Sequence, residues 1–134
     1  MPITPRVMSE SAKIQTVNIP IVAQAAGVDA ADIPFFKCPK DITITKIGVI
    51  PHATVDEHAD GSVILIEKAS TTIASRTYGT DLDYTAATYQ ALTLVAAQAN
   101  QLEDSVLTYS ITNGTAGTSP AMTLQMDYYV NESV

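Results

Sequence analysis

Apolar and polar residues alternate one by one along several short stretches of this chain, and no other feature limits its fold as strongly. In the longest stretch, 122–130, every second residue is apolar and the residues between are mostly polar. The stretches 107–111 and 17–21 repeat the pattern. Because a β-strand directs successive side chains to opposite faces, each stretch is predicted to be a strand with one buried and one solvated face.

Further runs are less regular but have the composition of strands: 33–38, 42–49, 63–66, 72–78 and 89–95. Turn-forming pairs such as Asp60-Gly61 and Asn113-Gly114 separate the runs. Helix is expected only within 86–104, as one turn near 96–101, and in total under about a tenth of the chain. The sequence therefore predicts an all-β, single-domain β-sandwich that is jelly-roll-like, with about eight strands, rather than a seven-stranded immunoglobulin-like sandwich.

Two runs carry more detailed predictions. In the 42–49 run, Ile42 and Ile44 have one parity and Ile47 and Val49 the other, which predicts a β-bulge or bend beside Gly48. The 63–66 run is apolar without a break, which predicts a strand covered on both faces.

The N-terminal stretch 1–12 differs from the rest. It contains Pro2 and Pro5, shows no strand alternation and cannot be helical around Pro5. We predict an extended arm over 1–12 and the sandwich domain over 13–134, since 134 residues match one domain. The arm is expected to bind a partner or a neighbouring subunit through its apolar and basic side chains, which are Ile3, Arg6, Val7 and Met8.

Charge is unevenly distributed along the chain. The net charge is −7, and all seven basic residues lie at or before Arg76. Phosphate neutralisation needs cations, so binding to nucleic acid or to an anionic membrane is disfavoured. No signal peptide or membrane span is expected either. With few lysines to guard the strand edges of the C-terminal half, an oligomer is favoured over a monomer.

No stretch provides a recognisable cofactor or metal site. Cys38 is the sole cysteine, so no intrachain disulfide can form, and it is expected to be a buried apolar residue. Histidines and carboxylates gather in one loop, but their spacing does not match a cupin-like or zinc site, and that loop is expected to be solvated. The loop residues are His52, Asp56, Glu57, His58 and Asp60.

Catalysis is also disfavoured. The sequence has two histidines, no Gly-x-Ser-x-Gly elbow and no phosphate-binding glycine loop, so we predict no enzymatic activity. Asp81 and Asp83 lie near three tyrosines in the sequence and leave carbohydrate binding as an alternative. The tyrosines are Tyr78, Tyr84 and Tyr89.

The order of segments in the chain resembles a known family. The segments that carry the resemblance follow the polar arm and are 36–39, 41–51, 73–78, 107–111, 113–117 and 124–128. They are similar to the small β-sandwich structural proteins of tailed bacteriophages, particularly the jelly-roll capsid decoration (cement) proteins.

That resemblance implies a homotrimer on the outer capsid surface, assembled in the host cytoplasm, which binds the major capsid protein and stabilises the shell by bridging neighbouring capsomers. It implies no catalytic residue, metal or cofactor. The alternative that the sequence leaves open is a tail- or fibre-associated module that binds carbohydrate or a receptor.

Overall fold

The computed structural model describes residues 13–56, 61–80 and 82–131. They form two antiparallel sheets with one three-residue 3-10 turn, η1, where one turn of helix was predicted. The all-β prediction is therefore confirmed. The strands are β1 (Gln15–Ile21), β2 (Ala30–Lys37), β3 (Ile42–Pro51), β4 (Ser62–Lys68), β5 (Thr71–Tyr78), β6 (Gln90–Ala91), β7 (Thr93–Leu94), β8 (Asn100–Gln101), β9 (Val106–Asn113) and β10 (Met122–Val130), and η1 spans Ala96–Gln98.

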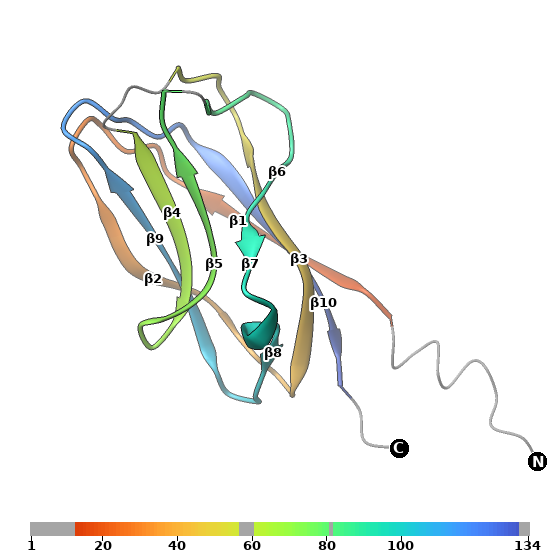
Figure 1. The fold of residues 1–134 in the computed structure, drawn as a ribbon. Helices are drawn as coiled ribbons and strands as arrows, with labels where there is room; N and C mark the ends of the chain where they lie inside the picture. The colour runs from red at the N-terminus through yellow and green to blue at the C-terminus, as the bar shows by residue number, and fades with distance from the viewer. Residues whose placement is uncertain (1–12, 57–60, 81, 132–134) are drawn as a thin grey trace, which may run out of the picture.

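The strand order is that of a jelly roll (Figure 1). The first sheet has the order β1-β10-β3-β6, with β8 also beside β3, and the second has the order β2-β9-β4-β5-β7. When β6, β7 and β8 are counted as one interrupted sixth strand, β9 and β10 become the seventh and eighth. The sheets then run 1-8-3-6 and 2-7-4-5, and the sixth strand also pairs with strand 5 through β7. The predicted jelly-roll-like sandwich of about eight strands is confirmed.

The interrupted strand closes one side of the sandwich. The predicted continuous strand 89–95 is wrong in this respect, because β6 pairs with β3 of the first sheet whereas β7 pairs with β5 of the second. Leu92, between β6 and β7, donates from its backbone N to Ile47 O of β3 at 2.9 Å. Val95, just after β7, donates to Ile73 O of β5 at 2.8 Å. Arg76, the last cation of the sequence, donates from Nη1 to Ala91 O at 2.9 Å. The backbone groups at this side are therefore paired across both sheets.

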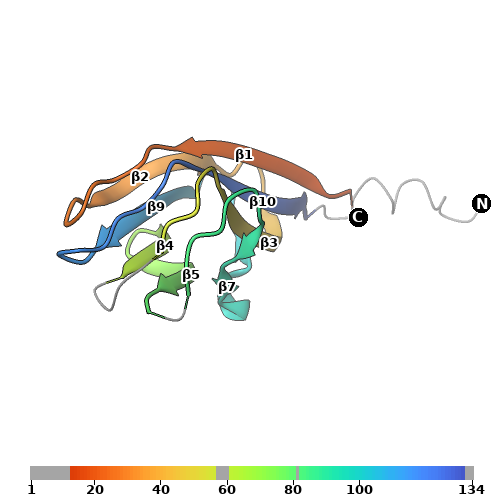
Figure 2. The same ribbon diagram turned by 90° about the horizontal axis from the view of Figure 1, so that it is seen from above.

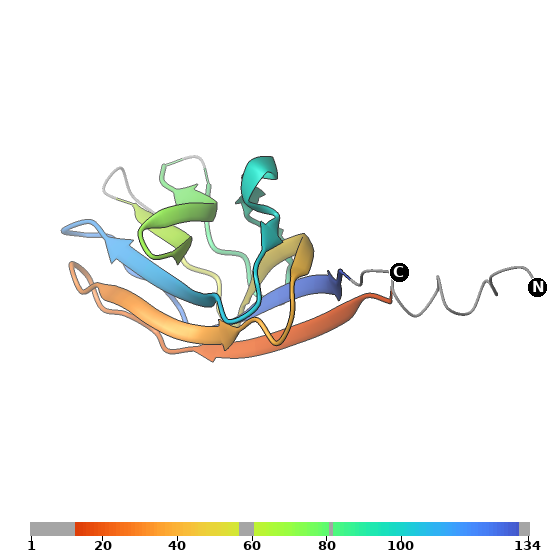
Figure 3. The ribbon, with the colours of Figure 1, turned by 90° about the horizontal axis from the view of Figure 1, so that it is seen from below.

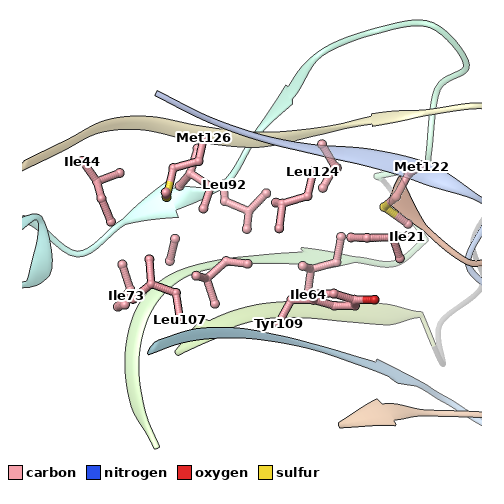
Figure 4. Packing of buried hydrophobic residues seen from close by; sticks show 14 of the residues in the cluster. Ile21, Ile44, Ile64, Ile73, Leu92, Leu107, Tyr109, Met122, Leu124 and Met126 are labelled. Atoms are coloured by element: carbon pink, nitrogen blue, oxygen red, sulfur yellow. The ribbon is translucent and has the colours of Figure 1, made fainter. Parts of the chain in front are cut away.

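The core lies between the sheets, where side chains from β10 and β3 face those from β9, β4 and β5 (Figure 4). The predicted parity of β10 is confirmed, since Met122, Leu124 and Met126 are fully buried. The prediction for 63–66 is wrong. Ile64 and Ile66 are buried in the core, but Val63 and Leu65, whose side chains lie on the other face of the second sheet, are only half-buried.

The predicted bulge exists, but three residues away from the expected place. Along β3, Asp127 of β10 pairs with Lys46 and Tyr128 pairs with Ile44, which leaves Thr45 as the extra residue. Gly48 has another role. The ring of Tyr89 lies over it so closely that any side chain at position 48 would collide with the tyrosine.

The connections β1–β2, β3–β4, β5–β6 and β9–β10 meet at one end of the sandwich, which we call the loop end (Figure 1). Asn113, at the end of β9, joins two of them. Its Nδ2 donates to Val28 O at 3.0 Å and Ala25 O at 3.4 Å, and its backbone N–H donates to the carboxylate of Asp29 at 2.9 Å. The predicted tight turn at Asn113-Gly114 is instead the start of a longer connection to β10.

The same connection packs against the residue that precedes β4. Gly114 N donates to Gly61 O at 3.0 Å, and a side chain at Gly117 would collide with that carbonyl. Gly61 itself has a φ of +54°, which favours glycine. The loop end is therefore held by hydrogen bonds between separate connections and by close backbone contacts.

We predict that Asn113→Ala lowers the free energy of unfolding by about 1–3 kcal/mol, because the buried side chain loses its hydrogen bonds to Val28 O and Ala25 O. The matched control is Asn18→Ala, which removes an exposed amide that accepts one hydrogen bond from Gln125. It should cost under about 0.5 kcal/mol. Urea denaturation measures both. Equal losses for the two variants would show that the buried amide has no special role.

We also predict that Cys38 does not react with iodoacetamide in the folded protein. The residue is fully buried, and its thiol pKa is raised, mainly by burial and also by Asp41, although Lys68 opposes the shift. Since the thiolate is the reactive species, burial and the raised pKa both slow the reaction. Mass spectrometry should detect alkylation only after unfolding in urea, and rapid labelling without urea would contradict the prediction.

Candidate interaction surface

The side of the sandwich opposite β6–β8 is not closed. There, β1 ends the first sheet and β2 ends the second, and the two edge strands lie side by side in both end views (Figures 2 and 3). Within the described part of the chain, β1 pairs with β10 alone and β2 pairs with β9 alone. No described segment bridges these edges along their length, as β6–β8 do on the far side.

Core side chains on this side are incompletely covered. In β1, Ile21 is 2% exposed, but Val17 and Ile19 on the same inward face are only half-buried. In β2, Phe35 and Phe36 are likewise half-buried, whereas inward residues of the central strands are fully buried. Partly covered apolar groups next to exposed ones are typical of surfaces that bind another molecule.

Exposed large apolar residues also occur in or next to the two edge strands. Eight such residues occur among the described residues, and four of them fall between positions 14 and 33. Val22 is 73% exposed, which is the largest value of the eight. We define the open side as the half-buried Val17, Ile19, Phe35 and Phe36 together with the exposed Ile14, Val22, Val28 and Ile33.

Aromatic contacts hold the two sheets together beneath the open side. Phe36 of β2 packs against Tyr128 of β10, with ring centroids 5.2 Å apart, and so joins the second sheet to the first. Phe35 packs against Tyr109 of β9 at 6.3 Å. Burial raises the pKa of the Tyr109 hydroxyl, as expected for a phenol at the edge of an apolar core.

The register shows which backbone groups of β1 are free. His52 N donates to Ala121 O. The backbone N–H and C=O groups of odd-numbered β10 residues therefore point to β3, and those of even-numbered residues point to β1. The partners in β1 are then its odd-numbered residues. The backbone groups of Thr16 and Asn18 therefore point outward, as does the nitrogen of Pro20, which has no hydrogen to donate.

The edge of β2 is protected in a similar way. Pro34 lies in mid-strand, and the pairing with β9 has two register shifts, between Ala30 and Ile33 and between Pro34 and Phe36. Prolines and bulges at an edge strand hinder the addition of further strands. Both edges of the open side thus carry a proline, which restricts open-ended sheet growth.

The outward face of the first sheet has a different character. Its exposed side chains are polar and pair with one another across neighbouring strands, so we call it the polar ladder. The pairs are Thr16 Oγ1 to Asp127 Oδ1 at 2.8 Å, Gln125 Nε2 to Asn18 Oδ1 at 3.0 Å, and His52 Nε2 with Thr123 Oγ1 at 2.9 Å.

Charged side chains are distributed differently in space than in sequence. The described part of the four loop-end connections contains Asp29, Asp56 and Asp83 but no lysine or arginine. At the opposite end, Asp104 of the C-terminal half lies 3.4 Å from Lys37 of the N-terminal half. One acidic residue of the C-terminal half is therefore paired with a basic residue of the N-terminal half.

The predicted partner-binding residues Ile3, Arg6, Val7 and Met8 lie outside the described residues. So do Glu57, His58 and Asp60 of the histidine loop, and Asp81. Within the described ranges, no group of three metal-ligating side chains occurs. The described residues also form no helix of the length and apolar character that crossing a membrane requires.

Two of the three tyrosines considered for carbohydrate binding are structural. The rings of Tyr78 and Tyr84 stack on each other at 3.7 Å and are at most 1% exposed. Their hydroxyls bond to Gln90 and Ser62, both at 2.7 Å. Buried rings offer no platform to a sugar.

Reasoning from the sequence did not identify the open side. The signal that could have found it is the placement of Pro20 and Pro34 within strand-like runs, because proline in a sheet is confined to edges, strand ends and bulges. Exposure of Val22 and Val28 has no such signal, since their connection is short and locally featureless.

We predict that replacing both edge prolines, Pro20→Val with Pro34→Val, increases self-association. The change restores outward N–H donors on two edge strands that flank apolar side chains. Light scattering during incubation at fixed concentration should show aggregates that the unmodified protein lacks. As a control, Pro39→Val replaces an exposed proline outside the strands and should have no such effect. A double variant that stays as dispersed as its parent would contradict the role assigned to the prolines.

Comparisons with known proteins show a fold likeness and nothing more. No protein-family model matches the chain, and no curated protein matches its sequence. Among solved structures, it is similar to VP2 in the crystal structure of an infectious bursal disease virus subviral particle, with 12% identity and a TM-score of 0.42. The match covers 90% of this chain and 34% of the VP2 chain, so this chain spans about a third of that protein. A likeness of this size carries no argument about activity or partners.

Proposed function

We propose that this protein is a non-enzymatic structural protein of a virus particle, which binds the outside of a bacteriophage capsid and bridges neighbouring capsomers. The observation that carries the proposal is the open side, where a jelly roll that is closed on one flank leaves core residues uncovered on the other. Viral capsid proteins, lectins and cupins use the jelly-roll architecture. A protein whose uncovered surface is apolar and rigidly framed is suited to binding another protein.

The open side fits attachment to a larger surface. Val22 and Ile33 are exposed on a framework fixed by the core and by the Phe36–Tyr128 contact. Burying apolar surface contributes about 25 cal/mol per Å², and a preorganised framework limits the entropy lost on binding. Moderate contacts, repeated by the symmetry of a shell, sum to tight attachment.

The partners in this proposal are the major capsid protein and further copies of this chain, arranged as a homotrimer. The net charge of −7 disfavours nucleic acid and anionic membranes as partners. We propose that the N-terminal arm, with Ile3, Arg6, Val7 and Met8, adds to the binding surface, and that no metal or cofactor takes part. The protein would assemble in the host cytoplasm and remain in the virion.

The alternative is a tail- or fibre-associated module that binds carbohydrate or a receptor. The polar ladder favours it, because it presents amide, hydroxyl and carboxylate groups in rows on one sheet. Tyr129 shares that face and is partly exposed. The ladder side chains are already paired with one another, however, and a sugar would have to compete with those bonds.

We predict that Val22→Asp combined with Ile33→Asp weakens co-sedimentation with empty phage shells by at least about tenfold, which corresponds to 1.4 kcal/mol. Both side chains are exposed, so the fold should persist, and circular dichroism can check this. The matched control is Leu102→Asp, at a residue 65% exposed at the end opposite the loop end. It should bind as the unmodified protein does.

The same experiment separates the alternative. If Val22→Asp with Ile33→Asp binds shells normally, the open side is not the attachment surface. If the unmodified protein binds no shell, yet binds a glycan array and loses that binding with Asn18→Ala and Gln125→Ala, the carbohydrate-binding alternative replaces the capsid proposal.

A further inference from the structure

We propose that residues 1–12 of a second copy add one short strand to the free edge of β1 and thereby cover part of the open side. This inference rests on the proposed self-association and does not depend on which shell the protein binds. The named occupant is thus a segment of this chain, supplied by a neighbour. The edge it would occupy is defined by the backbone of Thr16, Asn18 and Pro20 described above.

The free groups on β1 allow a short strand. Thr16 and Asn18 each present an outward N–H and an outward C=O, and Pro20 presents a carbonyl alone. A strand of about five residues satisfies these groups, and Pro20 limits pairing beyond them. If residues 3–8 pair, residues 9–14 remain as the link to the other copy and can extend over about 20 Å.

The sequence of the segment matches this edge. We propose that the added strand runs antiparallel to β1. Residues whose backbone faces β1 then place their side chains over the polar ladder, and the others place theirs toward the core, whereas a parallel strand would exchange the two faces and turn Arg6 toward the core. Pro5 has no N–H, so its backbone must face away from β1 and its side chain must face the core. That single condition fixes the parity of the whole segment.

The parity set by Pro5 puts Ile3 and Val7 on the core side, beside Val17 and Ile19. It puts the remaining residues of the run, Thr4, Arg6 and Met8, on the face of the polar ladder. Arg6 then lies on the same face as Asp127, whose carboxylate accepts from Thr16. Taken alone, the segment has no clear alternation, because Met8 and the prolines interrupt it. In a strand placed at this edge, Pro5 faces away from β1, Ile3 and Val7 face the core, and Arg6 lies on the face of Asp127, so all three features fit one parity.

A neighbouring copy is favoured over the same chain. β1 extends past the rest of the sandwich at its start (Figures 1 and 3), and Ile14, just before it, is 49% exposed. A return to its own β1 would need a turn within 9–14, where the only turn-forming side chains are Ser9 and Ser11, which favour turns more weakly than Gly, Pro, Asn or Asp. The β4–β5 turn does use Ala69 and Ser70, but at φ values of 47° and 73°, which is strained for non-glycine residues.

Cross-linking between differently labelled copies tests the proposal. Met8→Cys is mixed with isotope-labelled Asn18→Cys, and a short bismaleimide reagent is added, with Cys38 buried and silent. We expect a cross-linked pair that joins one labelled and one unlabelled chain. The matched control replaces Asn18→Cys by Thr77→Cys, an exposed residue of β5 in the other sheet, and should give no such product.

Three outcomes would overturn the proposal. The first is a cross-link that forms within the double variant Met8→Cys with Asn18→Cys but never between chains, which places the segment on its own β1. The second is an oligomer without either cross-link, and the third is a monomer at every concentration. None of these depends on shell binding, so failure of the capsid proposal in co-sedimentation remains a separate result.

A second pair of variants tests the parity. Val7→Asp puts a charge on the core side and should raise the concentration for half-association at least tenfold in analytical ultracentrifugation. Met8→Asp puts the same charge on the outer face and should change it less than threefold. Equal effects of the two substitutions would show that the segment does not pair with β1 in the proposed way.

Discussion

The two sides of this sandwich differ in how their backbone groups are satisfied, and the other properties of the molecule depend on that difference. On one side, β6, β7 and β8 donate to and accept from both sheets in turn, so the chain itself closes the core. On the other side, β1 and β2 keep unpaired outward groups and half-buried apolar side chains.

Much of the fold followed from the sequence because period-two patterning is a strong local signal. β10 and β9 were predicted with the correct buried faces, since Leu124 and Leu107 belong to unbroken alternations. The break between β6 and β7 was not predictable in this way. It depends on the backbone N–H of Leu92 bonding to β3 while that of Val95 bonds to β5, and this follows from the arrangement of two sheets rather than from the seven consecutive residues 89–95. The bulge was predicted beside Gly48 because glycine is a common residue at bulges, but it lies at Thr45. The role of Gly48 is to leave room for the ring of Tyr89.

The candidate site was much less accessible from the sequence. Its residues belong to two different sheets, and exposure of Ile33 or Val22 is decided by which strands have no outer neighbour. In the sequence, only Pro20 and Pro34 indicate that their strands lie at the edge of a sheet. The tyrosines show the converse error. Tyr78 and Tyr84 were close to acidic residues in sequence and suggested a sugar platform, yet their rings stack against each other in the interior. Proximity along the chain did not predict accessibility.

The pairing of β1 with β10 has a consequence for synthesis. Thr16 and Asp127 are hydrogen-bonded partners separated by 111 positions, and β1 has no other strand beside it in the described structure. The first strand to leave the ribosome therefore waits for the last before it can join a sheet, while β4 and β5 can pair as soon as their hairpin emerges. During that interval the N-terminal segment and β1 are both free in the same nascent chain. Where many ribosomes translate the same message, neighbouring chains would be in this state together, at the stage when exchange of segments between copies is easiest.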